Sequence, residues 1–381
     1  VHIDLYLMPR RVRPVLGLFG AACLSTWVSW RRMYYPLSSK SSLDFYNLPK
    51  PSPEETERHA RILRQLRIGL IASRDKAEKI LGKTESILKS NGISVDWLAA
   101  PPSPPALETT SNTGAAYDIL LHKIGEKGDK DMGRVLEERG GMRCLVIDPP
   151  HLANRAMNRI MHAKLCHEGL SDLKDVEFAA SAVLNSSNTL CNEQKALAWL
   201  AKNGLRLPVI FKPLGPDADP HDLCGVFNPK GLISAAMYHT PAIVQQYIPH
   251  DAQRLYKVYI LGRETVITQR QSLPLLNYCD ENPQEYQGRS NWHFGRVSKD
   301  MAVHAQPLDP EFVRRLSCIA ERLRAIFGLR MLNFDAVLER RTNRIIIVDV
   351  NYFPGYQKCF NDFGVRFMRF LAEAWLDREQ N

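Results

Sequence analysis

The sequence lacks the cysteine patterns that mark metal and redox motifs. Its eight cysteines include no CxxC pair and no spacing typical of metal ligands. In a chain of 381 residues such thiols are expected to be reduced and mostly buried, which favours a reducing compartment such as the cytoplasm. The chain also contains no internal repeat.

Acidic residues are missing from Leu5 to Leu43, where arginines flank the apolar run Val15–Trp30. This run is shorter than the ~20 apolar residues that a membrane-spanning helix needs. We interpret residues 1–60 as a leader or disordered extension that ends in a proline-rich linker, with a membrane anchor as the alternative. If the leader is real, the protein is organellar or membrane-associated, and any membrane contact involves residues 10–35.

Positive charge is in excess, but most of it lies in the first segment. Residues 1–43 hold six basic residues and Asp4, a net +5 of the total +9, which leaves +4 for residues 44–381. That excess is small for a protein that binds duplex nucleic acid. It suits a pocket that concentrates basic side chains around a polyanionic small molecule. We therefore expect no nucleic-acid partner.

The segment 66–165 predicts a parallel α/β sub-domain. Four strands are predicted, over residues 67–72, 93–98, 117–121 and 143–147, and a helix over residues 74–90 connects the first two. His122-Lys123 and Asp148 follow two of these strands, and open α/β sheets bind ligands at such ends. The string Gly82-Lys83-Thr84 resembles the end of a P-loop, but Ala77 stands where that loop needs glycine.

Two further sub-domains are expected, over residues 166–253 and 254–381. Lys212 ends the apolar strand 207–213, where its ammonium needs a partner such as an ATP phosphate unless it reaches solvent. Lys257 stands within another apolar strand. Residues 277–296 show no periodicity and predict a loop over the site, whereas 310–327 and 364–376 predict helices.

The segment 329–356 predicts a β-hairpin with a metal site. If its turn is centred on Thr342, Asp335 lies opposite Asp349, and Asn351 points to the same face. Two carboxylates so close repel each other unless a cation lies between them. Oxygen ligands of this kind suit Mg²⁺. The alternative is a hairpin whose acids are merely solvated.

The strings Asn333-Phe334-Asp335 and Asp349-Val350-Asn351-Tyr352-Phe353-Pro354-Gly355-Tyr356 resemble the inositol-tetrakisphosphate 1-kinases, also called inositol trisphosphate 5/6-kinases. The resemblance covers residues 66–376 and implies an α/β (α+β) ATP-grasp fold with an N-terminal parallel α/β sub-domain. It also implies ATP as co-substrate and one or two Mg²⁺ ions. The implied reaction moves the γ-phosphate to a ring hydroxyl of an inositol tris- or tetrakisphosphate, and we expect a monomer.

The same resemblance implies roles for individual residues. The residues implied in catalysis are Lys212, Arg270 and Asp349, and the metal ligands are Asp335, Asp349 and Asn351. The implied nucleotide contacts are Arg159, Lys212, Gln245, Ile248 and Ser272. The implied contacts to the inositol phosphate are Lys76, His122, Lys123, His221, Lys257, Asn351 and Gly355.

The resemblance breaks at residues 215–221, where the chain is one residue shorter than the family pattern and lacks its second glycine. His221 takes the place of the family's second histidine in this interpretation. Two alternatives to the kinase stay open. One is an ATP-grasp carboxylate–amine ligase, which would use the same metal hairpin, and the other is a non-catalytic protein that binds inositol phosphates.

Overall fold

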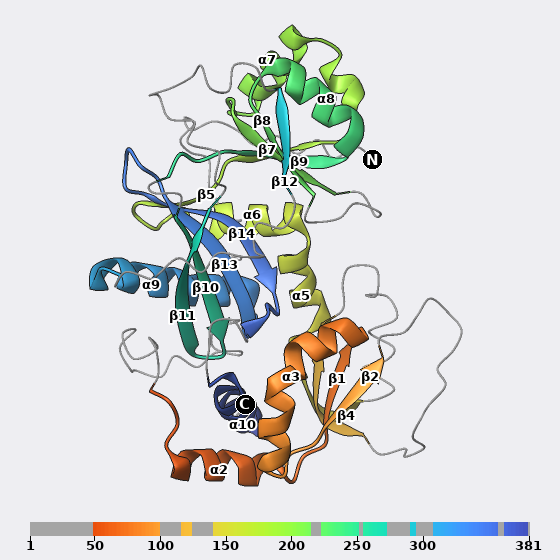
Figure 1. The fold of residues 1–381 in the computed structure, drawn as a ribbon, viewed down its shortest axis with the longest axis vertical. Helices are drawn as coiled ribbons and strands as arrows, with labels where there is room; N and C mark the ends of the chain where they lie inside the picture. The colour runs from red at the N-terminus through yellow and green to blue at the C-terminus, as the bar shows by residue number, and fades with distance from the viewer. Residues whose placement is uncertain are drawn as a thin grey trace, which may run out of the picture.

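The computed structural model of the protein describes residues 49–99, 116–123, 140–214, 222–250, 254–272, 290–294, 308–356 and 362–379. They form three sheets with helices packed around them (Figure 1). The apolar run Val15–Trp30 and the altered segment 215–221 lie outside the described residues. Within those ranges, no helix is long and apolar enough to cross a membrane.

The first sheet is parallel throughout, in the order β2-β1-β3-β4, which confirms the predicted N-terminal α/β sub-domain. All five residues of β1 are buried, as expected for a strand covered on both faces. The elements are β1 (Ile68–Ala72), α3 (Arg74–Ser90), β2 (Val95–Ala99), β3 (Tyr117–His122) and β4 (Gly140–Ile147). The P-loop-like string lies within α3.

A helix stands where the sequence predicted a proline-rich linker. Helix α2 (Pro53–Leu63) begins with a capping box, in which the side chains of Ser52 and Glu55 each accept a bond from the other's backbone N–H. It packs against α10 (Phe363–Glu379) and buries Leu63 completely. Arg369 of α10 also donates to the Pro49 carbonyl oxygen over 3.0 Å. The folded part of the chain therefore begins before residue 60.

The second sheet is antiparallel, in the order β12-β8-β7-β9-β6. Helices α7 and α8 pack on an apolar face that includes Val209, Phe211 and Val244. The elements are β6 (Ser181–Leu184), the 3-10 helix η3 (Ser187–Leu190), α7 (Glu193–Lys202), β7 (Val209–Pro213), β8 (Leu223–Val226), α8 (Pro229–His239), β9 (Ala242–Gln246) and β12 (Asn291–Phe294).

Strand β12 corrects the prediction that residues 277–296 form only a loop. It pairs with β8, and the preceding Ser290 lies so close to Gly231 at the start of α8 that a Cβ there would sit 1.8 Å from the Ser290 oxygen. Glycine is therefore required at position 231. Such a close approach gives no periodic signal in the sequence.

The third sheet has the order β11-β10-β13-β14-β5. Strand β5 (Val176–Phe178) is parallel to β14, and the other pairs are antiparallel. The remaining elements are α5 (Pro150–Met157), α6 (Arg159–Gly169), β10 (Arg254–Leu261), β11 (Glu264–Gln271), α9 (Pro310–Phe327), β13 (Met331–Leu338) and β14 (Ile345–Tyr352). Strand β5 belongs to the predicted sub-domain 166–253 but lies in the third sheet. Strand β12 belongs to the predicted sub-domain 254–381 but lies in the second sheet.

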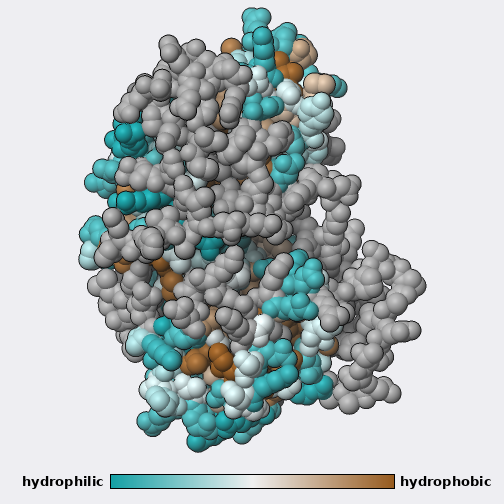
Figure 2. Space-filling model, viewed as in Figure 1, coloured by the Kyte–Doolittle hydropathy of each residue, from teal (hydrophilic) through white to brown (hydrophobic). Residues whose placement is uncertain are grey.

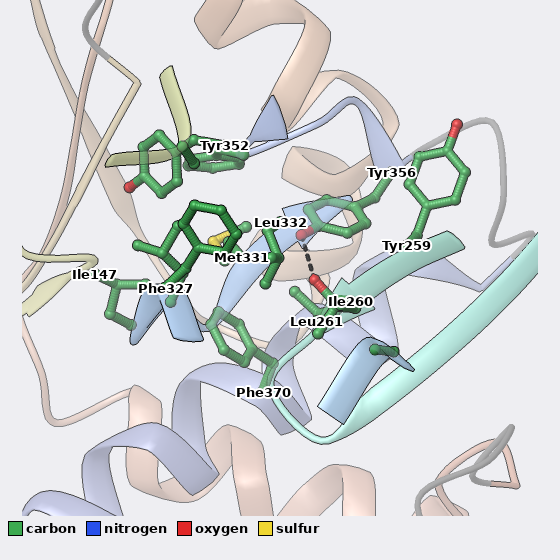
Figure 3. Packing of buried hydrophobic residues seen from close by; sticks show 14 of the residues in the cluster. Ile147, Tyr259, Ile260, Leu261, Phe327, Met331, Leu332, Tyr352, Tyr356 and Phe370 are labelled. Carbon is green, nitrogen blue, oxygen red and sulfur yellow. Dashed lines mark hydrogen bonds between the residues drawn. The ribbon is translucent and has the colours of Figure 1, made fainter. Parts of the chain in front are cut away.

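One hydrophobic core joins the first and third sheets. It runs from the N-terminal strands through α9 to α10, and Figure 3 shows Ile147 beside Phe327 and Met331. The second sheet packs around a separate core with α7 and α8. Hydrophilic side chains cover the outer edges of the molecule over α9 and α2 (Figure 2). The first and third sheets thus form one body, and the second sheet forms another with its own core.

Candidate active site

The centre of the site is the β13–β14 hairpin, where Asp335 pairs with Asp349 as predicted. The register near the turn would instead place Val348 opposite Asp335, because Leu338 pairs with Ile345 and Ala336 with Ile347. A β-bulge corrects this by leaving Val348 as the extra residue. The bulge therefore brings both carboxylates to one face.

Each carboxylate has a lysine beside it. Lys257 pairs with Asp335 in the β10–β13 ladder, and its Nζ lies 2.9 Å and 3.1 Å from the two carboxylate oxygens. Lys212 reaches the hairpin from β7, where its Nζ donates to the Val348 carbonyl oxygen over 2.8 Å and lies 3.8 Å from Asp349 Oδ1. The bulged residue thus supplies the acceptor that holds Lys212 beside Asp349.

Two asparagines orient the same carboxylates. The Asn351 amide donates to Asp349 Oδ2 over 3.0 Å, and the Asn333 amide donates to Asp335 Oδ1 over 2.9 Å. Asn333 and Asn351 also pair across the ladder, and Asn333 is buried. The sequence prediction omitted Asn333 from the site, although its spacing of two residues from Asp335 places it on the same face.

The positive charges keep Asp349 ionised. Burial would raise the pKa of Asp349, but Lys212 above all, then His162, Arg159 and Lys257, outweigh burial and hold that pKa below its usual value. The pKa of Lys212 is lowered because it is buried, and the nearby Asp349 only partly offsets this. An anion that approached Lys212 would therefore meet a cation with little solvent around it.

The donor set fits a magnesium ion that arrives with a nucleotide. The described residues contain no group of three or more His, Cys, Asp or Glu side chains that could hold a metal by themselves. The hairpin offers two carboxylates and the Asn351 amide, and Mg²⁺ is commonly held by one or two carboxylates together with substrate phosphates. The arrangement therefore suits a metal–nucleotide complex better than a closed metal cage.

Two of the predicted nucleotide residues, Gln245 and Lys212, lie on the sheet face opposite α7 and α8. Ile210 pairs with Gln245 and lies two residues before Lys212, so Gln245 and Lys212 share a face. Arg159, on α6, donates to the carbonyl oxygen of Pro213 over 3.0 Å. Ile248 and Val348 pack against the same small apolar cluster, which contains Val337 and Ile346. Gln245, Lys212 and Arg159 therefore lie around one region, and Ser272, which is buried, follows β11.

A further cation lies on the same face of the third sheet as Lys257. Arg270 pairs with Leu255, two residues from Lys257, so its side chain shares that face. Its Nη2 donates to the Tyr259 hydroxyl over 2.8 Å. Tyr259 in turn pairs with Asn333. Arg270 is thus connected to the residues around Asp335.

Two of the predicted acceptor residues, Lys76 and Lys123, lie at the C-terminal edge of the parallel sheet. Lys76 is exposed in the first turn of α3, directly after β1. Lys123 follows β3 and donates to the Phe353 carbonyl oxygen. Gly355 is exposed, with open space where a side chain would stand. His221 lies outside the described residues.

His122, an acceptor contact implied by the resemblance, is buried in this structure. Its ring is 2% exposed, and Nε2 lies 2.5 Å from the Asp148 carbonyl oxygen. The Asp148 carboxylate accepts from the backbone N–H groups of Arg330 and Met331. Burial raises the pKa of Asp148 to about 6, against the opposing effect of Arg330 and these bonds. His122 therefore stabilises a junction in this structure.

The sequence of the chain matches one protein family and several of its members. Residues 185–373 match the family described as the inositol 1,3,4-trisphosphate 5/6-kinase ATP-grasp domain. Inositol-tetrakisphosphate 1-kinase 2 of Oryza sativa subsp. indica is 30% identical over 269 residues, which cover 65% of this chain and 72% of the relative. Inositol-tetrakisphosphate 1-kinase 3 of Oryza sativa subsp. japonica is 29% identical over 317 residues, 79% of this chain and 82% of the relative.

Solved structures share the fold. D-alanine–D-alanine ligase from Bacillus anthracis, complexed with ATP, has a TM-score of 0.53 at 16% identity and covers 83% of this chain and 98% of its own. D-alanyl-alanine synthetase A from Vibrio cholerae has a TM-score of 0.53 at 17% identity, with 82% and 98% covered. The ATP-grasp fold predicted from the sequence is thereby confirmed. At these identities the likeness concerns the fold alone.

Proposed function

Because the chain belongs to the inositol-tetrakisphosphate 1-kinase family, we propose that it transfers the γ-phosphate of ATP to a ring hydroxyl of an inositol tris- or tetrakisphosphate. The observation that carries the proposal is the pair Asp335 and Asp349, opposed on one hairpin face with a lysine beside each. A binding protein has no need of two opposed carboxylates at a site for anions.

The nucleotide would lie between the second and third sheets. Lys212 and Arg159 would contact its phosphates, since Lys212 reaches Val348 of the hairpin and Arg159 bonds Pro213, the residue after Lys212. Gln245, Ile248 and Ser272 would surround the rest of the molecule. Charge-assisted bonds from buried cations are the strong ones in such sites, and Lys212 is 8% exposed.

Asp335, Asp349 and Asn351 would hold one or two Mg²⁺ ions. Magnesium at this place would neutralise charge on the β- and γ-phosphates. Phosphoryl transfer requires little covalent chemistry from the protein, so the chain contributes position and charge. Lys212 and Arg270 would stabilise negative charge on the moving group from two sides. Asn333 would keep the Asp335 carboxylate oriented through its 2.9 Å bond.

The acceptor would lie between the hairpin and the parallel sheet. Lys76 in the first turn of α3, Lys123 after β3 and Lys257 in β10 would supply three cations, and an acceptor with three or more phosphates would use all of them. The Gly355 backbone and His221 complete the proposed set. His122 would support Lys123 from its buried position.

We place this activity in a reducing compartment, because the described cysteines are all free thiols.

The experiment is an assay of the full chain with ATP, Mg²⁺ and inositol tris-, tetrakis- and hexakisphosphates supplied one at a time. Products are separated by chromatography and their ring positions assigned by ³¹P NMR. We expect one phosphorylated inositol with stoichiometric ADP, and loss of product with Asp349→Ala. Asp172→Ala is the matched control, because Asp172 is an acid paired with Arg322 on the molecular surface.

Two outcomes would contradict the proposal. Binding of ATP without phosphorylation of any inositol phosphate would favour a non-catalytic binding protein. Release of inorganic phosphate that depends on an added carboxylate and amine would favour a ligase.

A further inference from the structure

The ends of strands β3 and β4 are bonded to the end of β14 through one hydroxyl. The Tyr352 hydroxyl accepts from the Asp148 backbone N–H over 2.9 Å and donates to the His122 carbonyl oxygen over 3.1 Å. Tyr352 is 6% exposed, so water cannot easily replace these bonds. One side chain thus connects two strands of the first sheet to the strand that carries Asp349.

Further bonds cross the same junction. The Asp148 carboxylate accepts from the N–H groups of Arg330 and Met331, each over 3.0 Å, at the start of β13. Lys123 donates to the Phe353 carbonyl oxygen, and its Nζ lies 5.6 Å from the centre of the Phe353 ring. Both strands of the hairpin are therefore bonded to the edge of the parallel sheet.

From this geometry we propose that Tyr352 is a positioning residue that sets the acceptor side of the site relative to the hairpin carboxylates. The inference rests on the proposed kinase function. Tyr352 directly follows Asn351, and its hydroxyl bonds the residue before Lys123. One path from the proposed metal ligands to the backbone next to a proposed acceptor contact therefore runs through the Tyr352 hydroxyl.

The expected consequence is kinetic. Transfer requires the acceptor hydroxyl about 3–3.5 Å from the reacting atom, and a misplacement of about 1 Å can cost on the order of 100-fold in rate. Removal of the hydroxyl would break the bonds of Tyr352 to the ends of β3 and β4 and would loosen the junction at that point. Nucleotide contacts from β7 and α6 do not pass through this junction, so ATP binding should not change.

The chain offers a matched control four residues further on. Tyr356 is also buried, but its hydroxyl donates over 2.6 Å to the carbonyl oxygen of Ile260, which lies in the same sheet as the hairpin (Figure 3). Tyr356→Phe removes the same group without touching the junction. Any general effect of losing a buried hydroxyl appears in both variants.

The test compares wild type, Tyr352→Phe and Tyr356→Phe at a temperature where circular dichroism shows all three folded. We expect Tyr352→Phe to lower kcat/KM for the inositol phosphate on the order of 10-fold or more, with Kd for ATP within about 2-fold by calorimetry. Hydrogen exchange of peptides that contain Asp148 should accelerate only in Tyr352→Phe. Asp148→Asn, which weakens the same junction, should shift kcat/KM in the same direction.

Equal kcat/KM for the acceptor in the two tyrosine variants, with active wild type, would overturn the inference alone. The inference would also be overturned if both Asp148→Asn and Tyr352→Phe kept the wild-type kcat/KM for the inositol phosphate. If wild type phosphorylates no inositol phosphate, the proposed function itself fails, and the inference falls with it.

Discussion

Lys212 owes its place to a single extra residue in the facing strand. The bulge leaves Val348 as the extra residue of the strand, and the Lys212 ammonium donates to its carbonyl oxygen over 2.8 Å. The same ammonium lies 3.8 Å from Asp349. Val348, which no sequence pattern marks as a bulge, therefore positions both the Lys212 ammonium and the Asp349 carboxylate.

We predict that Lys212→Met weakens ATP binding. A hydrogen bond to a charged group contributes about 1.5–3 kcal/mol, which corresponds to roughly 10- to 150-fold in Kd. Calorimetric titration with ATP measures the change. Lys230→Met is the control, because Lys230 is exposed and faces Glu193 on the outer side of the same sub-domain. Equal Kd values for the two variants would show that Lys212 does not contact the nucleotide.

Asp148 predicts a pH dependence of stability. Its folded pKa of about 6 lies above its usual value of 3.8, so the folded state binds the proton more tightly than the unfolded state. The stabilisation is present below pH 3.8 and is lost as pH rises through 6. Between pH 4.5 and 7.5 wild type should lose about 2 kcal/mol relative to Asp148→Asn.

Urea unfolding of both proteins across that pH range measures the difference in free energy of unfolding. A difference that stays constant, or that grows in favour of wild type as pH rises, would contradict the raised pKa of Asp148.

At the scale of elements, helix α2 belongs to the cooperative fold. Its residue Leu63 is fully buried against the core shared with α10. We predict that Leu63→Ala lowers the free energy of unfolding by about 2–5 kcal/mol. Leu197→Ala on α7 is the matched control, because Leu197 is 48% exposed. If urea unfolding shows that Leu63→Ala lowers the free energy of unfolding no more than Leu197→Ala does, α2 is not part of the cooperative fold.

Elements with clear end signals were predictable from the sequence. The observed bounds of α9 are those predicted, since Asp309 caps its start and Gly328 ends it in a left-handed conformation. Helix α3 also keeps its predicted bounds, although its kink at Gly82 was not anticipated. Helix α2 was missed despite its Ser52-Glu55 capping box, because the prolines around it were interpreted as a linker.

The hairpin shows where prediction from the sequence ends. Alternation placed Asp335, Asp349 and Asn351 on one face, but the bulge that makes this true depends on the sheet as a whole.

Strand β12 was missed for a related reason. Its four residues pair with β8, which lies far away in the sequence, so its conformation is set by tertiary contact.

At the scale of the whole molecule, two bodies with separate cores meet at the hairpin. The first and third sheets share one core, and the second sheet approaches them with Lys212. The sequence could identify the cations on each body, because they stand at strand ends or among apolar neighbours. It could not predict the contact of Lys212 with Val348 or the bonds of Tyr352 across the junction, since these depend on how distant elements pack.

The measurement that tests the central claim most directly is the rate of inositol phosphate phosphorylation as a function of free Mg²⁺ at saturating ATP. Wild type, Asp349→Asn and Asp172→Asn are compared, with thermal unfolding as a check on folding. We predict a strict requirement for Mg²⁺ in wild type and in Asp172→Asn, and a loss on the order of 100-fold or more in Asp349→Asn. Metal-independent turnover, or an Asp349→Asn variant that matches wild type at every Mg²⁺ concentration, would contradict the assignment of the hairpin as the metal-dependent phosphoryl-transfer site.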